Sequence, residues 1–201
     1  PEDHLKMGEN EVLVYFRNEY NKDGNGLHSF TDTDGLQYVY TQSEPYWHNR
    51  IVPVFDQPDL FGVAKYFFLH PTDWVIVSNS STERTYEVLA EFANNNKEKG
   101  LFESLILKHY RDDFDSPDKS FTVFARTVPI CTYLFCFVAG PFSKIALPAE
   151  KEYKSIPMSI FCRKSKSKYI EAQQGFFFEV LIKEIFESFS IDYFKDRAYC
   201  Y

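Results

Sequence analysis

The sequence lacks an excess of positive charge and a long apolar run. Its formal net charge is -7 at pH 7, which argues against a nucleic-acid partner, because contacts with phosphates require clustered lysine and arginine. The longest apolar segment is VPICTYLFCFVAG at residues 128–140. It is shorter than the roughly 20 residues that cross a bilayer. We therefore expect a buried strand there and no membrane span.

Paired cysteine motifs and an N-terminal signal segment are also missing. None of the four cysteines forms a C-x-x-C pair: Cys131, Cys136, Cys162 and Cys200. We expect small buried residues and favour a reducing intracellular compartment. The chain begins with Pro1 rather than Met, so we expect a processed product or a fragment. The tripeptide at residues 79–81 fits a glycosylation acceptor, a pattern that often arises by chance.

Catalytic motifs are absent as well. The histidines are His4, His28, His48, His70 and His109. No two are four residues apart and no H-E-x-x-H occurs, so the helical zinc motif is missing. There is no Cys-His ligand spacing, no phosphate-binding glycine loop and no G-x-S-x-G. We expect each histidine to be a surface residue or a hydrogen-bonded one, and no catalytic or metal site in this chain.

The composition and the apolar pattern predict a mostly β protein with a real core. The chain has 201 residues, of which 44% are hydrophobic and 18% aromatic. Residues 11–20 alternate apolar and polar side chains, as a half-buried strand does. Residues 26–30 and 36–41 flank the turn sequence TDTDG and predict a hairpin. Residues 62–69 and 74–78 predict two further antiparallel strands.

A helical insertion is expected at about 83–110. Val88, Leu89 and Phe92 have helical spacing, and Gly100 is placed to end a helix, since glycine adopts the left-handed conformation. Strands are predicted again at three segments: 121–127, 132–140 and 155–162.

An amphipathic helix is predicted at 172–189, with a wide apolar stripe. A helix after a run of strands indicates a second domain, and the basic run at 164–167 is placed to mark the boundary. We therefore predict a β domain at 1–163 and the start of a truncated second domain at 164–201.

The segment YTQSEPYWHNRIVPVFDQPDL, from Tyr40 to Leu60, is too long and too polar for an ordinary hairpin connection. It resembles the signature of zinc aminopeptidases of the aminopeptidase N type, which reads Thr-Gln-x-Glu-Pro, then Arg, then Pro-x-Phe-Asp-Gln-Pro-Asp-Leu. The matching residues are Thr41, Gln42, Glu44, Pro45, Arg50, Pro53, Phe55, Asp56, Gln57, Pro58, Asp59 and Leu60.

Other blocks resemble the same family in the same order. They are DWVIVSNS at 73–80, TYLFCFVAGPF at 132–142, IPMSIFCRKSKSKY at 156–169 and the texture of 8–30. The resemblance implies a saddle-like antiparallel β-sandwich that precedes a catalytic domain. A complete family member would carry zinc in that later domain. The last eleven residues, 191–201, differ from the family's Tyr-Pro-Phe-x-Lys-Tyr-Asp segment.

The resemblance also implies roles for single residues. Gln42 and Glu44 correspond to the Gln and Glu that reach the substrate cleft, where a carboxylate binds the α-ammonium group of a peptide by charge-assisted hydrogen bonds. We interpret Arg50, Asp56 and Asp59 as structural, together with Gln57 and Pro58. An arginine can hold such a loop by pairing with a carboxylate, and Pro58 fixes the backbone beside both aspartates.

Three functions remain open. The first is the N-terminal portion of an aminopeptidase N-type zinc metallopeptidase, which shapes the substrate entrance and anchors peptide N-termini. The second is a catalytically inactive structural subunit of a larger assembly, with a protein partner that covers the 176–189 helix. The third is a general all-β module for sugars or peptides. In each case we expect the chain as given to be inactive as a peptidase.

Overall fold

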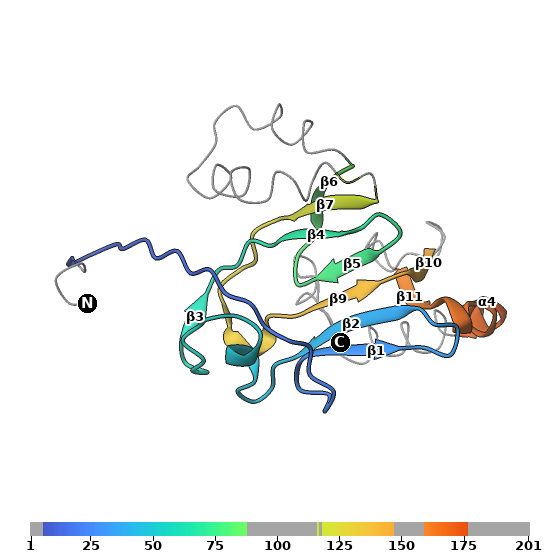
Figure 1. Cartoon of the computed structure of the whole chain (residues 1–201), viewed down its shortest axis with the longest axis horizontal. Coiled ribbons are helices and arrows are strands. Elements are labelled where there is room, and N and C mark those ends of the chain that lie inside the picture. Colours follow the sequence, from blue (N-terminus) through green and yellow to red (C-terminus); the bar gives the residue numbers. More distant parts are fainter. Residues whose placement is uncertain (1–5, 88–115, 117, 147–158, 177–201) are drawn as a thin grey trace.

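The computed structural model describes residues 6–87, 116, 118–146 and 159–176. Its largest sheet has four antiparallel strands in the order β1-β2-β9-β5. These strands span Gly26–Thr31, Gln37–Gln42, Phe137–Gly140 and Val75–Ser78, respectively. A second antiparallel sheet has the order β4-β7-β6, with strands at Phe67–Pro71, Lys119–Phe124 and Thr82–Tyr86. Figure 1 shows the two sheets as neighbouring layers.

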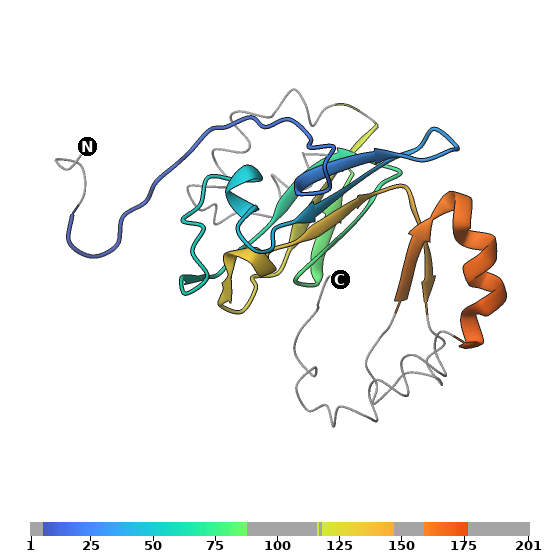
Figure 2. The same ribbon diagram turned by 90° about the horizontal axis from the view of Figure 1, so that it is seen from below.

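Two short strand pairs complete the described fold. β3, at Phe61–Gly62, pairs with β8, at Ile130–Cys131. β10, at Phe142–Ala146, pairs with β11, at Ser159–Arg163. The 3₁₀ turn η5, at Lys164–Lys166, then leads into α4, at Ser167–Phe176. Figure 2 shows α4 beside the β10–β11 pair. The predicted class holds: the protein is mostly β, with antiparallel sheets consistent with a β-sandwich followed by a helix.

The main core lies between the two sheets. Strand alternation turns Val39, Ile76 and Ala139 toward Phe124 of the second sheet. Phe68 joins the layers, because its ring lies 4.8 Å from that of Phe137 and 5.6 Å from that of Phe124. A second cluster on β4, β7 and β6 contains Tyr86, Phe121 and Val123. Burial of these apolar side chains is the main force that holds the layers together.

A polar chain crosses the second sheet, from the buried His70 and Thr122 to the exposed Thr85. His70 Nδ1 lies 2.8 Å from the carbonyl oxygen of Pro71, and a carbonyl only accepts, so Nδ1 carries the proton. Nε2 therefore accepts from Thr122 Oγ1 at 2.9 Å. Thr122 in turn accepts from Thr85 Oγ1 at 3.0 Å. His70 is thus a buried histidine whose two ring nitrogens are both hydrogen-bonded, one of the two environments expected from the sequence.

The predicted strand at 11–20 is wrong. Its side chains are exposed, including Val12 at 75% and Phe16 at 53%, and it has no strand assignment. Alternation alone does not make a strand, because the backbone N–H and C=O groups need a neighbouring strand to pair with. Among the described residues, no strand pairs with 11–20.

Other predicted boundaries move. The predicted insertion begins too early, because residues 82–86 form β6; its part from residue 88 lies outside the described residues. Residues 132–134 form the 3₁₀ turn η3 at Thr132–Leu134 rather than the start of a strand. The C-terminal helix begins at Ser167, five residues before the predicted start, and its part beyond 176 lies outside the described residues. In the part of the chain that is described, no helix has the length and apolarity needed to cross a membrane.

Candidate functional site

The 42–60 loop follows the end of β2 and leads to β3. Ser43 lies at its base, and a turn at 44–47 leads into the 3₁₀ turn η2 at His48–Arg50. Trp47 N donates to Ser43 O at 2.7 Å, and Ile51 N donates to His48 O at 2.8 Å. The Glu44–Pro45 peptide bond is cis. These contacts fold the first half of the loop back toward the sheet, and its remaining residues are mostly exposed.

Ser43 and His48 anchor the loop from inside. Both are buried, at 4% and 6% exposed. Ser43 Oγ lies 3.1 Å from His48 Nδ1 and donates to Phe135 O at 3.4 Å. Since that hydroxyl has one proton, His48 Nδ1 is the donor to it. Burial lowers the pKa of His48, and the nearby Asp56 charge opposes that shift. The pair is sequestered, so its role is to hold the loop rather than to supply a nucleophile.

Asp56 ties two halves of the loop to the neighbouring turn. Its carboxylate accepts from Asn49 N at 2.9 Å, from Asn49 Nδ2 at 3.0 Å and from Thr132 Oγ1 at 2.7 Å. Burial acts to raise the pKa of Asp56, but the hydrogen bonds from Asn49 and Thr132 outweigh it and the pKa lies below its usual value. Asp56 therefore makes the contacts that a structural carboxylate requires.

Arg50 contacts a different loop from the one we expected. Its Nη1 lies 4.0 Å from Asp23 Oδ2, and its guanidinium lies 4.0 Å from the Trp47 ring centroid. Among the described residues, no ion pair joins it to Asp56 or Asp59. The Arg50 carbonyl accepts from Asn18 Nδ2 at 2.7 Å. Arg50 thus links η2 to the turn before β1, through an ion pair that is exposed and weak.

The remaining motif residues form an exposed turn. Leu60 N donates to Gln57 O at 3.0 Å, with Pro58 and Asp59 between them. Proline is favoured at the second position of such a turn because its φ angle is already fixed. Gln57, Pro58 and Asp59 are all exposed. The two aspartates that the sequence grouped together therefore differ, since Asp56 is bound on both oxygens and Asp59 lies in solvent.

Gln42 and Glu44 are two residues apart at the start of the loop. Gln42 ends β2, opposite Gly26, and Glu44 begins the turn; both side chains are exposed. Among the described residues, no hydrogen bond or ion pair engages the Glu44 carboxylate. The Glu44 charge reaches Tyr133, whose pKa is raised first by a hydrogen bond with Cys131 and also by Glu44.

This arrangement suits binding of a cation. The exposed Glu44 carboxylate and the Gln42 side-chain amide supply acceptors for an ammonium group. Sequence reasoning assigned no site role to Ser43, His48 and Asn49 within the loop, or to Thr132, which the fold brings to Asp56. Thr132 and Tyr133 do lie in one of the blocks that carry the family resemblance, and that was the signal available. No group of His, Cys, Asp or Glu within the described residues fits a metal ion.

Comparison with known proteins finds a similarity to an aminopeptidase. No family model matches the chain. The chain is 27% identical over 173 residues to "Aminopeptidase N" of Streptomyces lividans. This similarity supports an aminopeptidase N-like relationship. The match covers 86% of this chain but 16% of the relative, so the chain spans a small part of the length of that aminopeptidase.

Proposed function

We propose that the chain is the N-terminal portion of an aminopeptidase N-type protein and that its 42–60 loop binds the free N-terminus of a peptide at the substrate entrance. The observation that carries this proposal is the state of Glu44. Its carboxylate is exposed, and no hydrogen bond or ion pair from the described residues engages it. It is held on a turn whose base is buried. The similarity to an aminopeptidase N supplies the class of ligand.

In this proposal each residue binds rather than reacts. Glu44 accepts charge-assisted hydrogen bonds from the α-ammonium group, and Gln42 lines the pocket of the first residue as donor or acceptor. The Ser43–His48 pair and Asp56 hold the loop in place before the ligand arrives. A loop that is already ordered loses less conformational entropy on binding. Zinc belongs to a complete protein of this type, and the described residues offer no ligand set for it, so no step here passes through a metal.

The first measurement is the intact mass of the protein from its source. We expect a mass well above the 23.7 kDa of this chain, because the zinc-bearing half would lie in the same polypeptide. A native mass close to that of the chain would contradict the proposal of a larger peptidase.

The binding role is then tested on that native protein. Glu44→Gln keeps the shape of the side chain but removes its charge. We expect about tenfold weaker binding of a free-amine peptide, since hydrogen bonds to charged groups contribute about 1.5–3 kcal/mol. Glu87→Gln is the matched control, because Glu87 is exposed outside the loop. An N-acetylated peptide should bind both variants equally. Equal loss of free-amine and acetylated peptide in Glu44→Gln would contradict ammonium recognition.

The alternative function of a structural subunit stays a prediction. Its supporting feature is the apolar helix predicted from the sequence at 176–189, and residues 177–189 lie outside the described residues. The protein partner that would cover this helix also stays a prediction.

A further inference from the structure

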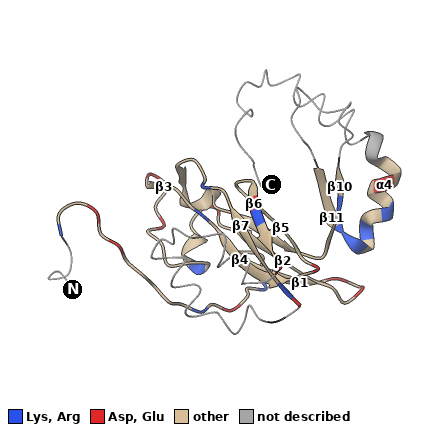
Figure 3. Ribbon diagram, turned by 90° about the horizontal axis from the view of Figure 1, so that it is seen from above, with Lys and Arg blue, Asp and Glu red and all other residues tan. Residues whose placement is uncertain are grey.

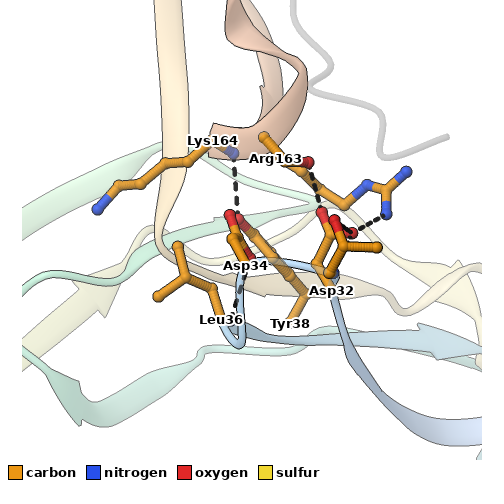
Figure 4. Close-up of polar contacts among 8 residues, drawn as sticks. Asp32, Asp34, Leu36, Tyr38, Arg163 and Lys164 are labelled. Carbon is orange, nitrogen blue, oxygen red and sulfur yellow. Dashed lines mark hydrogen bonds and ion pairs between the residues drawn. The ribbon is translucent and has the colours of Figure 1, made fainter.

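A polar clasp joins the β1–β2 turn to the segment between β11 and α4. We use the word clasp for Asp32, Arg163 and Ser165; Figure 4 shows Asp32 and Arg163 side by side. Arg163 Nη1 lies 3.1 Å from Asp32 Oδ1, and Ser165 Oγ donates to Asp32 Oδ2 at 2.6 Å. Thr33 N donates to Asp32 Oδ1 at 2.7 Å. The Asp32 side chain is 3% exposed, so its charge depends on these partners.

A second contact closes the same junction. Lys164 N donates to the Tyr38 hydroxyl at 3.1 Å, within the segment that the clasp holds. The Ser165 hydrogen bond, followed by that from Thr33, lowers the pKa of Asp32, and the Arg163 charge acts in the same direction. Asp32 is therefore an anion at neutral pH, and Ser165 is one of its direct donors. The Ser165 hydroxyl therefore helps to hold η5 against the β1–β2 turn, together with Arg163 and the Lys164 amide.

The sequence around Ser165 is strongly basic. It reads Arg163-Lys164-Ser165-Lys166-Ser167-Lys168, and the three lysines are exposed while Ser165 is half-buried. Figure 3 shows lysine and arginine gathered where β11 passes into α4. A serine flanked by cations suits kinases whose substrate groove is acidic, by charge complementarity. Ser165 therefore has two features together: basic neighbours in sequence and a hydrogen bond to the buried Asp32 carboxylate.

We propose that Ser165 is a phosphorylation site for a basophilic serine kinase and that its phosphate opens the clasp. In the transfer, Ser165 Oγ forms a bond to the γ-phosphorus of MgATP, the bond from that phosphorus to the ADP oxygen breaks, and the hydroxyl proton leaves to the kinase's base. The product has no donor to offer Asp32. A phosphoserine carries about -1.5 to -2 charges at pH 7, and it stands where Ser165 Oγ now lies against the carboxylate.

Charge decides the direction of the change. Arg163 and Lys166 are the two cations that act on Asp32, whereas Asp32 and the phosphate together carry about -2.5 to -3. The two anions repel, and Arg163 pairs better with the doubly charged phosphate. Asp32 then leaves to solvent and the β1–β2 turn separates from η5. Ser167 offers a comparison in the same basic run, because its Oγ donates to Lys164 O at 3.0 Å, whereas the serine that donates to Asp32 is Ser165.

The first test maps phosphate on the protein isolated from its source in the presence of phosphatase inhibitors. We expect fragmentation mass spectra to place phosphate on Ser165. Phosphate on Ser167 alone, or on neither serine, overturns the proposed site.

The second test follows the clasp itself in the full-length protein. Ser165→Asp should speed hydrogen exchange of the Lys164 amide at least about tenfold, because a charged hydrogen bond is replaced by repulsion. Ser167→Asp is the matched control and should leave that amide unchanged. In an Asp32→Asn background the effect of Ser165→Asp should shrink, since the repulsion is removed. An equal effect of both serine variants, or an unchanged effect with Asn at position 32, overturns the mechanism.

Discussion

At the scale of single residues, position in the fold separates side chains that the sequence treats alike. Asp56 and Asp59 lie in the same short motif. Asp56 accepts three hydrogen bonds from Asn49 and Thr132, whereas Asp59 is exposed. The same holds for Asn79, which fits a glycosylation acceptor in sequence. Its Nδ2 donates to Leu134 O at 2.7 Å and its Oδ1 accepts from Cys136 N at 2.7 Å, so in the fold it is a structural link.

We predict that Asp56→Ala lowers the free energy of unfolding by about 2 kcal/mol, because hydrogen bonds to a charged group are lost together. Asp59→Ala should change it by less than about 0.5 kcal/mol, as is usual for a surface substitution. Urea unfolding of the two variants measures both effects. Equal destabilisation by the two substitutions would contradict the role given to Asp56.

At the scale of elements, close approach of strands sets a requirement that no local pattern reveals. Gly140 ends β9 beside β2. A Cβ atom placed there would lie 2.6 Å from Tyr38 Cδ1 and 3.3 Å from Gln37 O. Tyr38 is 3% exposed, its ring packs 4.9 Å from that of Phe142, and its hydroxyl binds Lys164 N. It therefore has little room to move away.

We predict that Gly140→Ala costs about 2 kcal/mol of stability, a typical penalty for overpacking a core. Gly62→Ala is the control, because a Cβ atom there would meet nothing within 4 Å. Thermal and urea unfolding should separate the two variants clearly. If Gly140→Ala is as stable as Gly62→Ala, the contact between β9 and β2 is looser than described.

At the scale of the whole molecule, stability should depend on pH through two buried histidines. Burial lowers the pKa of His48, which sits under the 42–60 loop, and of His70, which sits in the second sheet. A lowered pKa means that the folded state binds fewer protons than the unfolded state. The stabilisation is then complete above the unfolded value of about 6.5 and is lost as pH falls through the folded pKa.

We predict that the free energy of unfolding falls between about pH 7 and pH 5, with a slope of at most about 1.4 kcal/mol per pH unit for each histidine. Protonation of His70 would also place a second donor against Thr122 Oγ1. Replacing both histidines with glutamine should flatten this part of the curve. Asp32 and Asp56 have lowered pKa values. The stability that these two carboxylates contribute is therefore lost only when the pH falls below about 4. A slope that persists in the double variant would contradict the assignment.

The sequence by itself determined the β-rich class, the β1–β2 hairpin and the position of the 42–60 loop. These features rest on local signals, since alternation, turn residues and prolines constrain the chain over a few residues. Sequence also carried the similarity to an aminopeptidase N. Reliance on local signals also explains the wrong prediction of a strand at residues 11–20. A strand needs a partner strand, and a local pattern does not contain that information.

Only the tertiary structure decided which residues meet. Thr132 reaches Asp56 across 76 positions of sequence, and Ser165 reaches Asp32 across 133. Such contacts follow from the packing of layers, and no spacing rule within one segment encodes them. The tertiary fold also left Glu44 exposed while it buried the neighbouring Ser43. That difference arises because Ser43 packs against His48 and Phe135, the latter 92 positions away, whereas Glu44 begins the exposed turn.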